Sequence, residues 1–356
     1  MSEMLKDLKN TLINMASDCD IIFITGHKEP DLDCVASAIG LYCIATFLGK
    51  EAYIVIDESD MNLESGVKKI KDECKNKYPI INAEEMKKLR TSDSGLILTD
   101  VGAKSLINFS DEIDSFKHIL IIDHHCQNSD AIPAEYKFIE PKASSACELI
   151  TQVLLFLKVK LNSRVADYLL AGIYLDTKRF VKNTSSKTLD VARRLMSRGA
   201  SSDRANELLL AKFEEDRKIN DLVFNGTVFE TYLNSPHQVS FTLNRENPTK
   251  IFSRVQLAKA ADKMLKYDVS AAFTMGYTKE GEITLCARSK KDDIDVSKIM
   301  QQFGGGGNRQ NAGGRIIGQD ILEIDRKLHL AVSNCIETFG GDSSFVERTP
   351  IQYEKK

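Results

Sequence analysis

The sequence predicts an α/β protein in which a parallel sheet carries helices on both faces, and a connecting helix leads to a smaller α/β domain. Short apolar runs, most of them rich in isoleucine, are typical of strands buried on both faces of a parallel sheet and occur at 21–24, 96–98, 119–122 and 171–174. Segments with helical character alternate with these runs. Beyond about residue 222, apolar and polar residues alternate, which indicates strands with one buried face.

The first domain is expected to span residues 1–201 and to begin with an amphipathic docking helix, because leucines recur at helical spacing within residues 1–20. Its other helices are bounded by residues that favour helix ends. Gly49 can adopt a left-handed cap, and serines precede the later helices. The expected elements are the helices 34–48, 147–157 and 187–198, the last opened by Ser186, and the strand 52–56.

A long polar helix at 202–222 is expected to connect this domain to the second, which would span 223–342 and be followed by a charged tail at 343–356. The second domain would close over the first and leave the ligand site in the cleft between them, a common position for such sites. Its expected elements are the strands 239–243, 269–277 and 283–287 and the helices 253–265 and 296–303.

Four short acidic or histidine-containing segments follow apolar runs of the first domain, at 26–33, 99–100, 123–125 and 175–177. Open parallel sheets gather ligands at the carboxyl ends of their strands, so three of these segments are expected to converge on one edge. Carboxylates brought together in this way repel one another unless cations lie between them. The pattern therefore predicts a metal site.

The charge count indicates two divalent ions. The available groups are four carboxylates and two imidazoles: Asp31, Asp33, Asp100, Asp176, His27 and His124. Two divalent ions would be neutralised by the four carboxylates, whereas one ion would leave about two buried charges uncompensated. A mixed oxygen and imidazole set favours Mn²⁺, with Co²⁺, Fe²⁺ or Mg²⁺ as alternatives. A single such residue is usually a cap or turn residue, but six of them at four element ends argue against that interpretation.

With these motifs in order, the chain resembles the DHH phosphoesterases over residues 18–340. Asp123, His124 and His125 form the triplet that names the family, and glycines 304–307 match the glycine motif of the associated DHHA1 domain. Four further segments resemble the catalytic module of the bacterial cyclic-di-AMP phosphodiesterase family GdpP: 26–31, 139–145, 176–178 and 287–289. NanoRNase and 3′-phosphoadenosine 5′-phosphate phosphatase relatives come next. The GdpP family carries membrane helices and sensory domains ahead of this module, so the chain is expected to be a stand-alone relative or a fragment.

The resemblance implies a role for each matching residue. The implied ligands are His27 and Asp31 for one metal, Asp33, His124 and Asp176 for the other, and Asp100 as a bridge between them. His125 would face the substrate phosphate. Asp123 would orient a neighbouring histidine, as carboxylates near metal-binding histidines commonly do, or would make a strand-terminal hydrogen bond. The implied substrate-binding residues of the second domain are Arg288, Ser289, Gly305, Gly306, Gly307, Asn308 and Arg309.

The run of four glycines at 304–307 has a large backbone entropy, which favours a backbone that approaches a ligand closely and offers its N–H groups to it. A flexible hinge is the alternative. The family usually has a histidine after these glycines, and this chain has Asn308, which can form hydrogen bonds but cannot become cationic. Arg309 and Arg288 could restore the positive charge. The substitution leaves the choice of substrate open.

Two ions roughly 3.5–4 Å apart can activate a shared water for attack on phosphorus. The resemblance implies Asp100 and His125 as the catalytic residues. No serine lies in a Gly-x-Ser-x-Gly context that would indicate covalent catalysis. The expected activity is Mn²⁺-dependent hydrolysis of cyclic di-AMP. The main rival is cleavage of short linear nucleotides or of 3′-phosphoadenosine 5′-phosphate. A pyrophosphatase ranks lower, and a non-catalytic nucleotide sensor would be expected to have a damaged ligand set.

The composition agrees with this interpretation. The chain has 356 residues, of which 42% are hydrophobic and 28% charged, and its net charge of −3 argues against binding to long nucleic acid. A cyclic or short linear nucleotide remains compatible. Eight cysteines without a Cys-x-x-Cys pair indicate reduced thiols in a cytoplasmic protein. We expect no membrane segment or targeting signal in this chain. A homodimer is compatible with the sequence.

Overall fold

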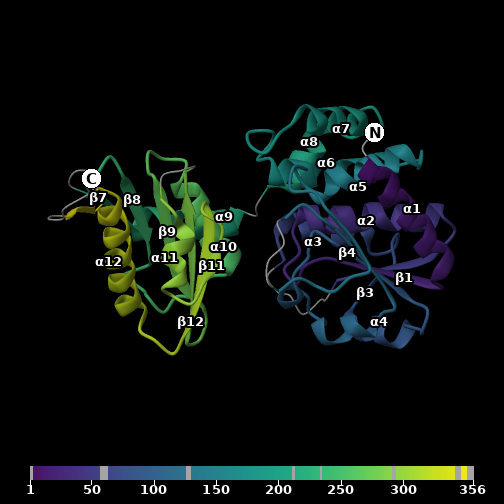
Figure 1. The fold of residues 1–356 in the computed structure, drawn as a ribbon. Helices are drawn as coiled ribbons and strands as arrows, with labels where there is room; N and C mark the ends of the chain where they lie inside the picture. The colour runs from purple at the N-terminus through teal and green to yellow at the C-terminus, as the bar shows by residue number, and fades with distance from the viewer. Residues whose placement is uncertain are drawn as a thin grey trace. The chain divides into compact units, whose positions relative to one another are not determined.

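The structure is a computed structural model that describes residues 3–56, 63–125, 130–210, 213–232, 235–290, 294–340 and 346–350. Contacts within the chain divide it into two compact units, residues 1–211 and 212–356. Figure 1 draws the first unit in purple to teal and the second in green to yellow. Each unit has its own sheet and its own hydrophobic cores.

The first unit is built on a six-stranded sheet in the order β3-β2-β1-β4-β5-β6. All neighbouring strands are parallel, which confirms the predicted α/β class. The chain moves outward from β1 towards β3 and from β4 towards β6, so the order reverses between β1 and β4, where such sheets bind ligands. The strands are β1 (Ile21–Thr25), β2 (Glu51–Val55), β3 (Ile80–Ile81), β4 (Gly95–Thr99), β5 (His118–Asp123) and β6 (Tyr136–Ile139).

Helices cover both faces of this sheet because alternate strand residues enter different cores. Ile22 and Ile24 belong to the core under most of the helices, whereas Phe23 belongs to the core on the other face. The helices of the first face are α1 (Glu3–Asp18), α2 (Leu32–Phe47), α3 (Ser65–Cys74), α5 (Ala146–Phe156), α6 (Ser163–Asp176), α7 (Ser186–Met196) and α8 (Ser202–Leu208). The other face is covered by α4 (Ala83–Leu89) and the short 3₁₀ segments Lys104–Leu106 and Ser110–Ser115 (Figure 1).

Several predicted elements differ in detail. The apolar run at 171–174 resembles the strand sequences, but it lies inside α6, a helix of 14 residues that begins after the N-cap Asn162. Helix α7 is capped by Ser185, not opened by a cap at Ser186.

The single connecting helix predicted at 202–222 is wrong, because the structure has two helices there, α8 and α9 (Phe213–Gly226). Tertiary contacts accompany the end of α8 after about two turns. Lys69 of α3 donates a hydrogen bond to the Glu207 carbonyl, and the Leu208 carbonyl packs directly against Gly66 of α3. The division between the two compact units follows at residue 211.

The second unit has a seven-stranded sheet in the order β11-β12-β10-β9-β8-β7-β13, in which only β8 and β9 pair in parallel. Helices α9 and α10 (Arg254–Met264) pack on one face, and α11 (Val296–Gln301) and α12 (Ile321–Gly340) pack on the other. The strands are β7 (Thr227–Tyr232), β8 (Gln238–Thr242), β9 (Ala271–Lys279), β10 (Glu282–Ser289), β11 (Gly306–Gly307), β12 (Asn311–Ile317) and β13 (Val346–Pro350).

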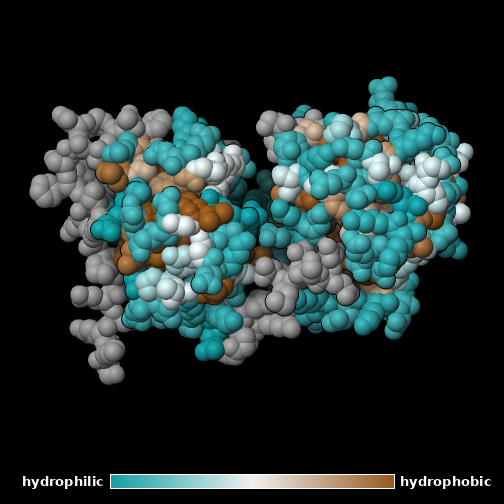
Figure 2. Space-filling model, turned by 90° about the horizontal axis from the view of Figure 1, so that it is seen from below, coloured by the Kyte–Doolittle hydropathy of each residue, from teal (hydrophilic) through white to brown (hydrophobic). Residues whose placement is uncertain are grey.

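The tail predicted at 343–356 includes strand β13, which pairs with β7, and its last residues lie outside the described part of the chain. The surface visible in Figure 2 is mainly hydrophilic on both units, with an apolar area on the second. Among the described residues, no helix is both long enough and apolar enough to cross a membrane. The cysteines of the described residues are free thiols.

Candidate metal centre

Acidic and imidazole side chains gather at the carboxyl ends of three strands and at the end of α6. His27 and Asp31 follow β1, Asp33 lies in the first turn of α2, Asp100 follows β4, His124 follows β5, and Asp176 is the last residue of α6. Potential ligand atoms lie within 4.8 Å of one another in the group His27, Asp31 and Asp100 and in the group Asp33, His124 and Asp176. A third group, Asp100, His124 and His125, overlaps both. The structure therefore brings together all six predicted ligands.

The Asp100 carboxylate lies between the first two groups. Its Oδ2 atom is 3.6 Å from His27 Nε2, and its Oδ1 atom is 3.3 Å from His124 Nε2. One oxygen thus faces each group, which is the placement that a ligand shared by two ions requires. The predicted bridging role of Asp100 is compatible with this geometry.

The backbone at Asp100 is in the left-handed region, with φ of +58°. This conformation costs a residue with a side chain about 1–2 kcal/mol, and aspartate is one of the few types that adopts it routinely. It persists because the Asp100 N–H donates a hydrogen bond to the Ile122 carbonyl, which extends the β4–β5 pairing by one residue. The resulting turn directs a buried carboxylate into the cluster. Such strain is concentrated at functional sites.

Helix N-termini hold two of the other carboxylates. Asp31 is the N-cap of α2, and its Oδ1 accepts hydrogen bonds from the N–H groups of Asp33 and Cys34 at 2.9 and 3.0 Å. Asp33 accepts from the first amides of α5, Ala146 N at 2.7 Å and Cys147 N at 2.9 Å. The partial positive charge of a helix N-terminus stabilises a carboxylate there. Both side chains are thereby fixed before any ion arrives.

Asp123 organises the histidine pair that follows β5. Its Oδ1 accepts from His124 N, His125 N and His125 Nδ1 at 2.8, 3.1 and 2.9 Å. The strand-terminal hydrogen bond and the contact with a histidine ring, considered as alternatives from the sequence, are both present. The His125 side chain is 61% exposed, so a ligand can reach it, whereas the His124 side chain is 12% exposed.

The cluster is short of positive charge. Burial and the negative charge of Asp100 raise the pKa of Asp31 to about 7, and burial also raises the pKa of Asp33 and Asp176. Burial lowers the pKa of His27, but contact with Asp100 and Asp31 outweighs it and raises that pKa to about 9. The pKa of His124 is raised in the same way by Asp100 and Asp176. The carboxyl and imidazole groups of the cluster thus favour their protonated forms. Bound cations would supply the same positive charge in place of the protons.

Two buried atoms of the cluster also lack hydrogen-bond partners among the described residues: Asp100 Oδ1 and His124 Nε2. His124 Nε2 lies 3.1 Å from Asp176 Oδ2 and 3.3 Å from Asp100 Oδ1, but neither contact has hydrogen-bond geometry. Unpaired buried polar atoms are costly unless another partner satisfies them. Oxygen and imidazole atoms that converge in this way fit divalent cations such as Mn²⁺.

Comparison with known proteins identifies the first unit. Residues 21–173 match the family described as DHH family, N-terminal domain. The first unit is a DHH-family domain. The triplet Asp123, His124 and His125 and five of the six candidate ligands fall within the matched residues, and Asp176 lies just beyond them.

The relatives of this chain differ in length. It is 30% identical to the cyclic-di-AMP phosphodiesterase GdpP of Geobacillus thermodenitrificans over 93% of this chain and 50% of that protein. It is 25% identical to the bifunctional oligoribonuclease and PAP phosphatase NrnA of Mycoplasma genitalium over 91% and 96%. The chain therefore spans about half the length of the GdpP relatives it matches. An exopolyphosphatase-related protein of Bacteroides fragilis shares the fold, with a TM-score of 0.74 and 16% identity over 94% of this chain and 97% of that one.

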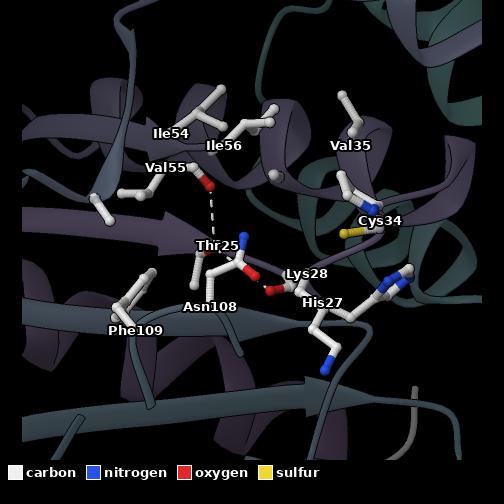
Figure 3. Close-up of a pocket in the computed structure, with 14 residues that line it drawn as sticks. Thr25, His27, Lys28, Cys34, Val35, Ile54, Val55, Ile56, Asn108 and Phe109 are labelled. Carbon is white, nitrogen blue, oxygen red and sulfur yellow. Dashed lines mark hydrogen bonds between the residues drawn. The ribbon is translucent and has the colours of Figure 1, made fainter. Parts of the chain in front are cut away.

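A pocket of about 440 Å³, part of it open to solvent, adjoins the cluster of candidate metal ligands and shares His27 with it (Figure 3). Its walls are mostly apolar and include Val35, Ile54 and Phe109. In Figure 3 the His27 ring points away from Asn108 and Phe109. Hydrogen bonds join the loop that carries His27 to the segment at 105–106. Lys28 donates from its backbone N to Leu106 O and from Nζ to Ser105 O.

The predicted substrate-binding residues of the second unit lie together at one end of its sheet. Arg288 on β10 is in register with Asn311 on β12, and the turn between β11 and β12 holds Asn308 and Arg309. Ser289 is buried, and its hydroxyl donates to the Arg309 carbonyl. The Arg288 guanidinium contacts Asp262 Oδ1 at 3.2 Å. The Arg288 and Ser289 side chains thus already have partners within the second unit.

The Asn308 side chain is committed in the same way. Its Oδ1 accepts from Gln310 N and Asn311 N at 3.0 and 2.8 Å, and its backbone N donates to Asn311 O. The side chain therefore closes the β11–β12 turn, a common use of asparagine. This bonding pattern was not apparent from the sequence.

Close packing explains most of the glycine run. A Cβ atom at Gly305 or Gly307 would lie 2.2 or 2.3 Å from a backbone oxygen of β12 or its turn, and Gly304 has a φ of +68°. At Gly306 a Cβ atom would meet open space. Packing against β12 therefore requires Gly305 and Gly307, and a left-handed backbone favours Gly304. Gly306 is the position where close approach of a ligand remains the predicted reason.

Sequence reasoning missed two residues near Asp33, one packed against it and one in the first turn of α5, whose amides hold it. Gly172 of α6 lies against Asp33, since a Cβ atom there would be 2.9 Å from Asp33 Oδ1. Glu148 of α5 is a fully buried carboxylate. A signal for Glu148 was available, because Ser145 followed three residues later by a glutamate is the capping-box pattern.

Proposed function

We propose that this DHH chain is a metal-dependent phosphodiesterase that hydrolyses cyclic di-AMP to linear pApA. The observation that carries the proposal is the Asp100 carboxylate, with one oxygen directed to each of two ligand groups. The similarity to GdpP, whose name states this substrate, supports the choice of a cyclic dinucleotide. We propose Mn²⁺ as the metal because oxygen and imidazole ligands suit it.

When bound, a pair of divalent ions would lower the pKa of a water molecule towards neutrality and stabilise charge on the phosphoryl oxygens. In this proposal the Asp100 carboxylate contributes one oxygen to each of the two ligand groups and so fixes their separation. His125 holds a phosphoryl oxygen through Nε2, because its Nδ1 faces Asp123. The hydrogen bond to Asp123 raises the pKa of His125, which favours the doubly protonated ring that can donate from Nε2.

The environment of the cluster favours an organic phosphate over inorganic pyrophosphate. The pocket next to His27 offers apolar walls to an uncharged part of the substrate, which pyrophosphate lacks. Arg288 and Arg309 of the second unit are the cations that we propose for additional phosphate contacts. We assign this activity to the cytoplasm, the compartment of small nucleotide substrates and free thiols.

A second candidate is an NrnA-type enzyme that acts on linear short nucleotides. The 25% identity to the Mycoplasma genitalium NrnA, which extends over 91% of this chain, supports this candidate. Asn308, which replaces the histidine usual in the GdpP-like glycine motif, also favours a change of substrate.

Turnover of a substrate panel with Mn²⁺ tests both candidates. The panel contains cyclic di-AMP, cyclic di-GMP, pApA, 3′-phosphoadenosine 5′-phosphate and pyrophosphate. We expect cyclic di-AMP to have the highest kcat/KM. Cleavage of linear substrates alone would transfer the assignment to the NrnA type, and binding of Mn²⁺ and nucleotide without turnover would indicate a sensor.

The Asp100→Ala variant tests whether turnover depends on the metal centre. It should lower kcat by more than about 100-fold, because it removes the carboxylate whose two oxygens face the two groups. Asp167→Asn is the control: Asp167 is another buried carboxylate, but it pairs with Arg204 and Ser201 N, not with the cluster. It should leave kcat within about 3-fold of wild type, since additive effects are expected at separate sites.

A further inference from the structure

Glu148 is a fully buried carboxylate with four hydrogen bonds. Its Oε2 accepts from Ser144 N, Ser144 Oγ and Thr188 Oγ1 at 3.1, 2.7 and 2.8 Å, and its Oε1 accepts from Gln152 Nε2 at 3.3 Å. The residue is 1% exposed. These bonds join three segments, namely the loop before α5, the helix α5 itself and the N-terminal turn of α7.

The hydrogen-bond pattern departs from an ordinary capping box. Ser145 Oγ accepts from Glu148 N as an N-cap should. In a capping box the glutamate would bond back to the N-cap N–H, but here its carboxylate bonds to the preceding residue, Ser144, and to Thr188. The start of α5 is therefore anchored to α7 instead of being closed on itself.

The amides that follow this anchor hold Asp33. Ala146 N and Cys147 N, immediately after Ser145, donate to the two carboxylate oxygens of Asp33 at 2.7 and 2.9 Å. Gly172 of α6 closes the other side of Asp33, where a Cβ atom would lie 2.9 Å from Oδ1. The orientation of Asp33 thus depends on where the first turn of α5 lies.

We infer that Glu148 is a positioning residue for one of the two ions of the proposed metal centre. By fixing Ser144 and Thr188, it fixes the first turn of α5, and that turn orients Asp33 within the group Asp33, His124 and Asp176. The group His27, Asp31 and Asp100 is held by β1, β4 and α2 and does not use this anchor. The inference rests on the proposed function, because it assumes that both groups bind metal.

The experiment measures Mn²⁺ binding to the full chain by isothermal titration calorimetry for wild type, Glu148→Ala, Glu148→Gln and Asp167→Asn. Thermal unfolding of each variant without metal measures the loss of stability alone. Glu148→Gln keeps one acceptor oxygen towards Ser144 and Thr188, and its amide can face Gln152, whose own amide can rotate to accept. Thr188→Val removes one of the four hydrogen bonds to Glu148, together with the Thr188 bonds to Ser185 in the α7 capping box, and serves if Glu148→Ala does not fold.

We expect Glu148→Ala to weaken one of two Mn²⁺ sites by about 10- to 100-fold and the other by less than about 3-fold, the size seen when outer partners of metal ligands are removed. Glu148→Gln should bind Mn²⁺ nearly as wild type, and Thr188→Val should show a smaller loss at the same site. Asp167→Asn should lose stability without this selective effect. Activity should follow, with a lower kcat and an unchanged KM for the nucleotide.

Three outcomes would overturn the inference while leaving the metal centre intact. The first is two unchanged Mn²⁺ sites in Glu148→Ala. The second is an equal loss at both sites that Asp167→Asn reproduces, and the third is a Glu148→Gln variant as defective as Glu148→Ala. A wild-type chain that bound no Mn²⁺ at all would instead overturn the proposed function.

Discussion

At the scale of single residues, Asp100 must satisfy two demands that few side chains meet together. Its backbone is left-handed, which glycine, asparagine and aspartate tolerate best, and its position between His27 and His124 calls for an anionic ligand. Glycine would adopt the left-handed backbone without strain but would supply no ligand. Glutamate would supply a carboxylate but adopts a left-handed backbone less readily than aspartate. Aspartate is the residue type that combines a left-handed turn with a short carboxylate.

Two substitutions of Asn308 distinguish a structural role in the turn from a contact with the substrate, because the two roles predict opposite orders of KM. Its Oδ1 accepts two backbone hydrogen bonds within the β11–β12 turn, and Asn308→Asp would keep both acceptors. We expect Asn308→Asp to retain a KM near the wild-type value. Asn308→Ala should raise KM by about 5-fold, because the turn loses roughly 1 kcal/mol of side-chain bonding. Steady-state kinetics with cyclic di-AMP and pApA measure both.

The opposite ranking would show that the Asn308 amide contacts the substrate phosphate, because an aspartate there would repel it. Gly306→Ala is the companion variant, since its Cβ atom meets open space in the hairpin. Unchanged thermal stability with a raised KM would place a ligand against Gly306.

At the scale of elements, the sequence predicted the site wherever one strand or helix end determined it. The isoleucine-rich runs located β1, β4 and β5, and their carboxyl ends located His27, Asp31, Asp100 and His124. Local patterns could not separate the run at 171–174 from a strand, because a short apolar run has no clear period. The true helix was marked by its length and by Asn162, well before the run.

Features that depend on two distant segments were beyond sequence reasoning. The hydrogen bonds of Glu148 join residues 144 and 188, and the fit of Gly172 against Asp33 joins two helices. The end of α8 is set by Lys69 and Gly66 of α3, so no residue within 202–222 signals the break. Tertiary contacts of this kind override local propensity.

The packing of α12 on β7 leads to a prediction of pH dependence. His329 of α12 bonds to Glu230 of β7 through Nδ1 at 2.8 Å, lies 3.4 Å from Asp325 through Nε2, and stacks on Phe241. Burial lowers the pKa of His329, but Asp325 and Glu230 outweigh it and raise that pKa above its ordinary 6.5. Its stabilisation is therefore complete below pH 6.5 and is lost as the pH rises through the folded-state pKa.

We expect His329→Gln to cost about 3 kcal/mol at pH 6, because the buried Glu230 carboxylate loses its cationic partner and keeps neutral ones such as the Tyr232 hydroxyl. The difference from wild type should shrink as the pH rises to about 9, since the wild-type protein then loses the same interaction. Scanning calorimetry of the full chain at both pH values measures the difference. His237→Gln is the control, because His237 bonds to the neutral Ser270 hydroxyl. A difference independent of pH would mean that His329 is neutral in the fold.

At the scale of the whole molecule, the chain consists of two units with separate sheets and cores, and the candidate ligands belong to only one of them. A ligand that binds the folded state alone stabilises what it binds by RT ln(1 + [L]/Kd), about 2.7 kcal/mol at 100 times Kd. Saturation with Mn²⁺ should therefore act on the first unit and leave the second unit unchanged.

Hydrogen exchange followed by mass spectrometry on the full chain can resolve this difference. With Mn²⁺ at 100 times its Kd, core amides of the first unit that exchange by unfolding should slow by about 100-fold, including Ala146 and Cys147 at Asp33. Core amides of the second unit should change by less than about 2-fold. A chelator should reverse the protection, and Asp100→Ala should lack it. Equal protection of both units would mean that they unfold as one cooperative body, because metal held by the first unit would then stabilise residues that contribute no ligand.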